Sequence, residues 1–333
     1  MLNLAEIQPR GAMTKEKFTP LAHEIFTLKK QLNAVILAHN YQVPEIQDVA
    51  DFVGDSLGLA QQAARTDADV IVFCGVHFMA ETAKILNPNK IVVLPDKDAG
   101  CSLEESCPAP KLAELQKTNP NFWTIAYINC SAAVKALCNV IVTSGNAEKI
   151  VNAAPKDKDL LFVPDENLGQ WVMEQTGRPM TLWKGNCYAH VEFQRDQVLA
   201  AKQQFPDAKI IVNPESLREV RELADAVCST EKMISYCRTS PAKRFVIVTE
   251  SGIIHRMKKA CPDKEFFCAP VFNAMKLPTD GCRCSECKFM KLNTLEKVRD
   301  CMKHLGPQVE LPPEIIQRAR LPIERMLEIS ARS

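Results

Sequence analysis

The 333-residue sequence contains no hydrophobic run long enough to span a membrane, and its longest apolar stretches are strand-sized. Residues 1–18 lack the continuous apolar segment of a signal peptide, so we expect a cytoplasmic protein with no membrane partner. The 41 Lys+Arg and 40 Asp+Glu leave a formal net charge of +1, which gives no general attraction to nucleic acid. The remaining composition is that of an ordinary globular protein, and the length predicts two or three domains.

Two nucleotide-binding signatures are also absent. The sequence has no Gly-x-Gly-x-x-Gly fingerprint after a predicted first strand and no Walker A loop. These absences argue against a dinucleotide-dependent enzyme and against a P-loop NTPase.

Cysteine, in contrast, is abundant, with 14 residues. Without a secretion signal, this number points to reduced thiols and metal binding and not to a disulfide scaffold. Five of the cysteines lie inside apolar segments and are predicted to be small buried hydrophobes, namely Cys74, Cys130, Cys138, Cys228 and Cys237.

Near-continuous apolar runs followed by helical patterns predict buried parallel strands. Three of them, at residues 33–41, 122–129 and 209–215, each begin a similar unit. Two further strand-like runs follow each one, at 70–74 and 91–96, at 140–144 and 160–165, and at 226–229 and 245–250. The pattern predicts an α/β fold of three similar βαβαβ (Rossmann-like) lobes with parallel sheets. One large doubly wound sheet is the alternative.

We expect lobe one at residues 20–98, lobe two at 99–182 and lobe three at 183–295. Helices within residues 296–333 are expected to pack back on lobe one. Residues 44–54 are interpreted as an extra helix-sized insertion between the first two strands of lobe one.

Three places in the chain carry cysteines that follow the last predicted strand of a lobe. They are Cys101, Cys187 and the Cys-x-Cys-x-x-Cys stretch at residues 282–287. Functional loops lie at the carboxyl ends of parallel strands, so three lobes around a common axis could bring one thiol each to a shared point. Three thiolates would leave an open coordination position for Lewis-acid chemistry. A local zinc or redox site at 282–287, in a zinc-binding interaction protein or a redox sensor, is the alternative.

Polar side chains also lie at the carboxyl end of the first predicted strand in each lobe, which is the corresponding position in all three lobes. They are His39 and Tyr41, Tyr127 and Asn129, and Asn213 and Glu215. Ser56, Ser144 and Thr230 directly precede predicted helices. They are expected to be N-caps, and three of them at corresponding lobe edges suggest a central chamber that binds anions.

Several of these segments resemble one known family. Residues 38–48, 54–57 and 73–84 closely resemble quinolinate synthase, the A protein of NAD biosynthesis, and further matches occur at 127–129, 143–146, 164–168 and 229–230. The resemblance implies three similar α/β lobes in a pseudo-threefold triangle around a central site.

The resemblance also implies one [4Fe-4S] cluster held by one cysteine from each lobe, which by position are Cys101, Cys187 and Cys287. Cys287 is preferred over Cys282 and Cys284 because residues 287–290 are similar to the family's cysteine-x-x-Met context. The fourth iron would bind substrate or water and act as a Lewis acid.

The family reaction condenses iminoaspartate with dihydroxyacetone phosphate and releases phosphate and water to form quinolinate. An L-aspartate oxidase or dehydrogenase is a possible transient partner that supplies the imine. By resemblance, Tyr41, Glu215 and His39 are catalytic. The implied substrate-binding residues are His39, Ser56, Tyr127, Asn129, Ser144, Asn213, Glu215 and Thr230.

One departure from the family concerns Asn213. The family commonly has His-Pro-Glu-Cys where this chain has Asn-Pro-Glu-Ser at residues 213–216. Asn forms hydrogen bonds but does not carry a proton near pH 7, so we predict that Asn213 orients a neighbour. His190, three residues after Cys187, is either a supporting or substrate-contacting group or a surface or structural histidine.

Overall fold

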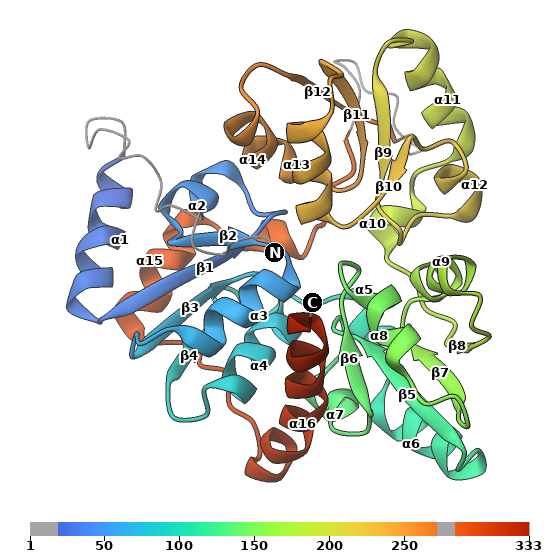
Figure 1. Ribbon diagram of the computed structural model, residues 1–333. Helices are drawn as coiled ribbons and strands as arrows, with labels where there is room; N and C mark the ends of the chain where they lie inside the picture. The colour runs from blue at the N-terminus through green and yellow to red at the C-terminus, as the bar shows by residue number, and fades with distance from the viewer. Residues whose placement is uncertain (1–18, 272–283, 333) are drawn as a thin grey trace.

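Three separate parallel sheets form the framework of the protein. The structure, a computed structural model, describes residues 19–271 and 284–332. Each sheet has four strands, and helices lie between them in sequence. Figure 1 shows the sheets in three lobes around a common centre, with lobe one in blue, lobe two in green and lobe three in yellow and orange. The expected α/β fold of three similar lobes is therefore confirmed, and a single large sheet is excluded.

The elements follow one another in the order that the apolar patterns predict. Lobe one contains α1 (Pro20–Gln31), β1 (Ala34–His39), α2 (Pro44–Val49), β2 (Phe52–Gly54), α3 (Ser56–Arg65), β3 (Val70–Cys74), α4 (His77–Leu86) and β4 (Ile91–Val93). Lobe two contains α5 (Ser102–Ser106), α6 (Ala109–Thr118), β5 (Phe122–Tyr127), α7 (Ala132–Lys135), β6 (Val140–Val142), α8 (Ala147–Ala153), β7 (Asp159–Val163), α9 (Glu166–Thr176) and β8 (Thr181–Leu182).

Lobe three and the C-terminal region complete the chain. Lobe three contains α10 (Tyr188–Val191), α11 (Arg195–Gln204), β9 (Lys209–Val212), α12 (Arg218–Arg221), β10 (Ala226–Val227), α13 (Thr230–Thr239), β11 (Arg244–Val248), α14 (Ile253–Ala260) and β12 (Glu265–Cys268). The 3-10 helix η3 (Met290–Leu292), α15 (Leu295–His304) and α16 (Pro313–Ala331) follow. Among the described residues, none of the helices has the length and hydrophobicity needed to cross a membrane.

The three sheets share one strand order. It is β2-β1-β3-β4 in lobe one, β6-β5-β7-β8 in lobe two and β10-β9-β11-β12 in lobe three. A short helix and a short strand therefore follow the first strand of every lobe. The interpretation of residues 44–54 as an insertion is wrong, because α2 and β2 are the counterparts of α7 and β6. Each lobe has four strands and not the three that the pattern predicted.

The two last helices attach to different lobes. The helix α15 packs on α1 of lobe one, as expected. The helix α16 packs on α4 of lobe one and also on α7, β6 and α8 of lobe two. Its residues Ala319, Ile323 and Met326 are fully buried in this contact region. The helix α16 thus joins lobes one and two, whereas the sequence led us to expect packing on lobe one.

Candidate active site

A cavity lies where the three lobes meet. Every candidate site residue from the sequence lines it: His39, Tyr41, Ser56, Cys101, Tyr127, Asn129, Ser144, Cys187, Asn213, Glu215, Thr230 and Cys287. The strands β1, β5 and β9 end toward this cavity, because their carboxyl ends carry the polar residues of the set.

The three thiols reach the cavity from the starts of three short helical turns. Cys101 precedes α5, Cys187 precedes α10, and Cys287 lies shortly before η3. Burial raises the pKa of all three thiols, and hydrogen bonds from the backbone of the following turn oppose this rise at Cys101 and Cys287. Besides burial, the negative charge of Glu215 and then those of Cys101 and Cys287 raise the pKa of Cys187.

The donor set fits an iron–sulfur cluster. Three sulfur atoms from three lobes converge on one cavity, and a bound cation would offset the cost of burying thiolates. Three cysteine ligands would leave one iron of such a cluster without a protein ligand.

Glu215 is a buried carboxylate held between two donors. The Tyr127 hydroxyl donates to its Oε1 over 2.7 Å, and Nδ1 of His190 lies 3.3 Å from its Oε2. Burial raises the pKa of Glu215, but His190 and Tyr127 outweigh this effect, so the net pKa lies below the ordinary value. His190 is itself only 2% exposed and lines the cavity, so it is not a surface histidine.

Tyr41 is hydrogen-bonded on the opposite side of His190. Its hydroxyl lies 2.7 Å from Oγ1 of Thr249, and the amide of Asn213 donates to it over 3.2 Å. Burial and the negative charge of Glu215 raise the pKa of Tyr41 well above its ordinary value. Tyr41 therefore remains a protonated phenol, which is able to donate a proton.

His39 is a neutral donor. Burial lowers the pKa of His39 to about 3, with Glu215 opposing the shift. Its Nδ1 accepts the backbone N–H of Tyr41 over 3.2 Å. The ring proton of the neutral imidazole is therefore on Nε2, the nitrogen that remains able to donate.

The three hydroxyl residues are not the N-caps that we expected. Asp55 caps α3 by accepting the N–H of Gly58 over 2.8 Å, and Ser56 is the first helical residue. Thr230 is likewise the first residue of α13, whereas Ser144 precedes Asn146, the cap position of α8. The helices begin one residue earlier at α3 and α13, because the preceding residues hold the extended cap conformation.

The sequence reasoning missed Asp55, Thr143 and Glu250, which also line the cavity. Burial and the charge of Glu231 raise the pKa of Asp55 to about 6. Glu250 is fully buried and forms an ion pair with Lys291 at 2.7 Å. The position of Glu250 two residues after the end of β11 was an available signal, because the carboxyl-end rule applies to every strand of a sheet and not only to the first.

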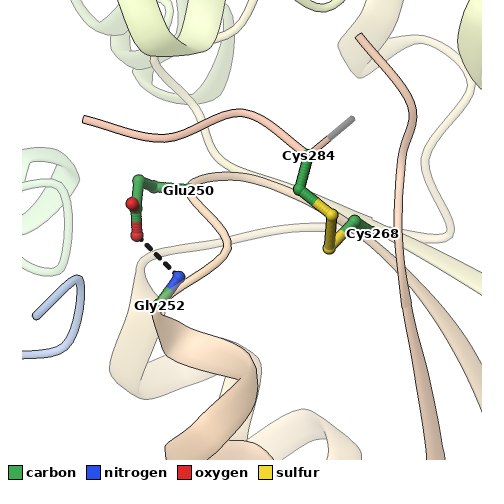
Figure 2. The surroundings of a disulfide bond; sticks show 4 residues. All are labelled: Glu250, Gly252, Cys268 and Cys284. Carbon is green, nitrogen blue, oxygen red and sulfur yellow. Dashed lines mark hydrogen bonds between the residues drawn. A yellow bond between two sulfur atoms is a disulfide. The ribbon is translucent and has the colours of Figure 1, made fainter. Parts of the chain in front are cut away.

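A disulfide lies beside the third thiol. Figure 2 shows Cys268, at the end of β12, bonded to Cys284, and their Cα atoms are 5.7 Å apart. Glu250 accepts the N–H of Gly252 over 2.7 Å, as Figure 2 shows, and also accepts the N–H of Cys287 over 3.2 Å. The disulfide therefore anchors the segment that leads to Cys287.

This bond corrects the expectation of reduced thiols for Cys268 and Cys284, whereas the other cysteines among the described residues are free. Cys284 pairs with Cys268 because a β-bridge between Pro270 and Cys284 brings their segments together. Cys282 lies outside the described residues. Of the five cysteines expected in the core, Cys74, Cys130 and Cys237 are buried, and Cys138 and Cys228 are half-buried.

Comparisons with known proteins agree with the motif resemblance. The family model described as "Quinolinate synthetase A protein" matches residues 23–328. The chain belongs to the quinolinate synthase family. It is 52% identical to the quinolinate synthase of Prochlorococcus marinus (strain MIT 9303) over 305 residues, which cover 92% of this chain and 90% of that protein. It is 50% identical to the quinolinate synthase of Cyanophora paradoxa over 317 residues, which cover 95% and 94%.

Proposed function

We propose that this chain condenses iminoaspartate with dihydroxyacetone phosphate, forming quinolinate, phosphate and water for NAD biosynthesis in the cytoplasm. Family membership supports the proposal. The observation that carries it is the single cavity, in which three thiols and nine other predicted site residues from all three lobes meet. An L-aspartate oxidase or dehydrogenase would act as a transient partner by supplying the unstable imine.

Cys101, Cys187 and Cys287 are the proposed ligands of a [4Fe-4S] cluster. When bound, the cluster supplies an iron with an open position, which as a Lewis acid makes a substrate hydroxyl a better leaving group. A local zinc site at residues 282–287 is less well supported, because Cys284 is engaged in the disulfide with Cys268.

Anionic substrates are proposed to bind through neutral donors. Among the described residues that line the cavity, none is Lys or Arg. The negative charges would therefore face the Nε2–H of His39, hydroxyl and amide groups, and the first turns of α3 and α13. Besides His39, the proposed binding residues with neutral donors are Ser56, Tyr127, Asn129, Ser144, Asn213 and Thr230. Glu215 is also a proposed binding residue, but as a carboxylate it would accept a substrate proton and would not contact a negative charge.

Glu215 and Tyr41 are the proposed base and acid. The lowered pKa of Glu215 keeps its carboxylate ionised at neutral pH, so it can remove a substrate proton. The raised pKa of Tyr41 keeps its phenol protonated, so it can donate one. Isomerisation, dehydration and ring closure each require such proton transfers.

The proposal is tested by iron and acid-labile sulfide analysis of anaerobically purified Cys101→Ala, Cys187→Ala and Cys287→Ala. We expect each variant to lose the visible absorbance of the cluster and the formation of quinolinate. Cys237→Ala and Cys282→Ala are the controls and should retain both. A cluster that survives Cys287→Ala but disappears in Cys282→Ala would refute the ligand assignment, and a colourless wild-type protein containing zinc would refute the proposed cofactor.

A further inference from the structure

A chain of hydrogen bonds behind the cavity wall connects the proposed acid with the proposed base. Nε2 of His190 lies 2.8 Å from Oγ1 of Thr249, which lies 2.7 Å from the hydroxyl of Tyr41. Nδ1 of His190 faces Glu215. Thr249 directly follows β11, is 1% exposed and bridges Tyr41 and His190, whose hydroxyl oxygen and Nε2 also lie 3.4 Å from each other.

Asn213 determines the direction in which this series of hydrogen bonds runs, because it donates to Tyr41 at one end of the series. Its Oδ1 accepts the backbone N–H of Glu215 over 3.0 Å, which fixes the orientation of the amide. Its Nδ2 therefore faces Tyr41 and, at 3.5 Å, Thr249, and an amide nitrogen only donates. The Tyr41 oxygen accepts this proton. Its own proton is then directed to Thr249 at 2.7 Å, because its other neighbour, Nε2 of His190, is farther away at 3.4 Å.

Because a hydroxyl carries only one proton, the direction of the first hydrogen bond determines the direction of those that follow. When Thr249 accepts from Tyr41, its own proton is directed to Nε2 of His190. His190, accepting at Nε2, then carries a ring proton on Nδ1, which lies 3.3 Å from the Oε2 of Glu215 without an aligned hydrogen bond. Tyr127 donates to the other carboxylate oxygen. The hydroxyls of Tyr41 and Thr249 and the Nε2 of His190 are thus each satisfied when the donors run from Asn213 toward His190.

We propose that Thr249 is a positioning residue whose hydroxyl fixes this direction and holds Tyr41 and His190 in place for the reaction. The expected kinetic effect rests on the proposed function. The direction of the hydrogen bonds does not depend on it. Because Thr249 lies behind the lining residues, its removal affects the chemical step more than substrate binding.

A matched pair of variants separates the hydroxyl from the shape of the side chain. Thr249→Val retains the branched shape and removes the hydroxyl, whereas Thr249→Ser retains the hydroxyl. We expect Thr249→Val to lower kcat at least about 10-fold, with KM within about threefold, because misplaced catalytic groups lose rate. Thr249→Ser should restore kcat to within about threefold of wild type. Equal losses in both variants, or an unchanged kcat in Thr249→Val, would overturn the proposal.

Neutron diffraction from wild-type crystals grown in D₂O tests the direction without any activity measurement. We expect the deuteron of Tyr41 to point to Thr249, that of Thr249 to point to His190, and the ring deuteron to lie on Nδ1. A deuteron on Nε2 of His190 would reverse the second link and refute the proposal. If the wild-type enzyme forms no quinolinate, the proposed function fails, and the neutron result still decides the direction of the chain.

Discussion

Asn213 illustrates how one side chain can orient a site without exchanging a proton. It accepts the N–H of Glu215 and donates to Tyr41, so it contacts the backbone of the proposed base and the hydroxyl of the proposed acid. The sequence alone predicted this orienting role, because an amide retains donors and acceptors but does not titrate near pH 7.

Replacing Asn213 with His tests whether the position requires a proton carrier. We expect no rise in kcat, because Tyr41 and Glu215 are the proposed proton-transfer groups and both are in place. Asn213→Ala should lower kcat about 10-fold, since losing one buried hydrogen bond costs on the order of 1–3 kcal/mol. Steady-state kinetics of quinolinate formation measure both. A turnover that rises from near zero in Asn213→His would contradict the orienting role.

Asp55 makes the stability of the fold depend on pH. Its pKa is raised from 3.8 to about 6 by burial and Glu231, while Arg256 opposes the rise. The folded state therefore binds more protons than the unfolded chain between these values, so stability falls as pH rises from about 4 to 6. At about 1.36 kcal/mol per pKa unit, the contribution is at most about 3 kcal/mol.

Asp55→Asn removes this titration and retains the oxygen that caps α3. We expect the variant to lose less stability than wild type when urea denaturation is compared at pH 4.5 and pH 6.5. If the free energy of unfolding changes by the same amount in wild type and in the variant between these two pH values, the assignment is contradicted.

Part of the candidate site was predictable residue by residue, and part depended on three-dimensional contacts. The end of a buried strand is visible in the sequence. The rule that functional side chains lie at the carboxyl ends of parallel strands therefore identified His39, Tyr127 and Glu215. Thr249 and Asp55 look ordinary in the sequence, because their importance comes from side chains distant along the chain, such as Tyr41 and Glu231.

Among the elements, the longest strands were easiest to predict. The strands β1, β3, β5 and β11 are five or six residues long and mainly apolar. In contrast, β8 has two residues and β2 has three, too few to show a periodic pattern. These two strands exist because a longer neighbour offers its backbone groups, which also explains why residues 44–54 resembled an insertion.

The Cys268–Cys284 bond, which begins at the end of β12, is expected to contribute measurably to the stability of the fold. A cross-link across 16 residues contributes about 3 kcal/mol in the loop-entropy account. We expect reductant to lower the thermal midpoint of wild type, and Cys268→Ser to show the lower midpoint with or without reductant. Anaerobic thermal denaturation with a phosphine reductant measures this. Cys237→Ser, in the same lobe, should remain sensitive to reductant, and an insensitive wild type would contradict the prediction.

For the whole molecule, α16 determines how lobes one and two remain together. Met326 is fully buried on this helix, whereas Leu321 is 63% exposed. Met326→Ala should lower the free energy of unfolding by about 2–5 kcal/mol through the cavity it leaves, and Leu321→Ala should change it by about 0.5 kcal/mol or less. Urea denaturation distinguishes the two, and equal effects would mean that this contact is not needed for the assembly of the lobes.

The position of α16 also affects how the protein is made. Ribosomes synthesise the N-terminal lobes first, but α16, which covers α4, α7 and β6, is translated after all three sheets. Until then, the apolar surfaces of lobes one and two are exposed while lobe three is being synthesised, which is the period when nascent chains aggregate. A chain whose translation is interrupted before α16 would therefore have the strands of all three sheets and an uncovered, chaperone-binding surface between two lobes.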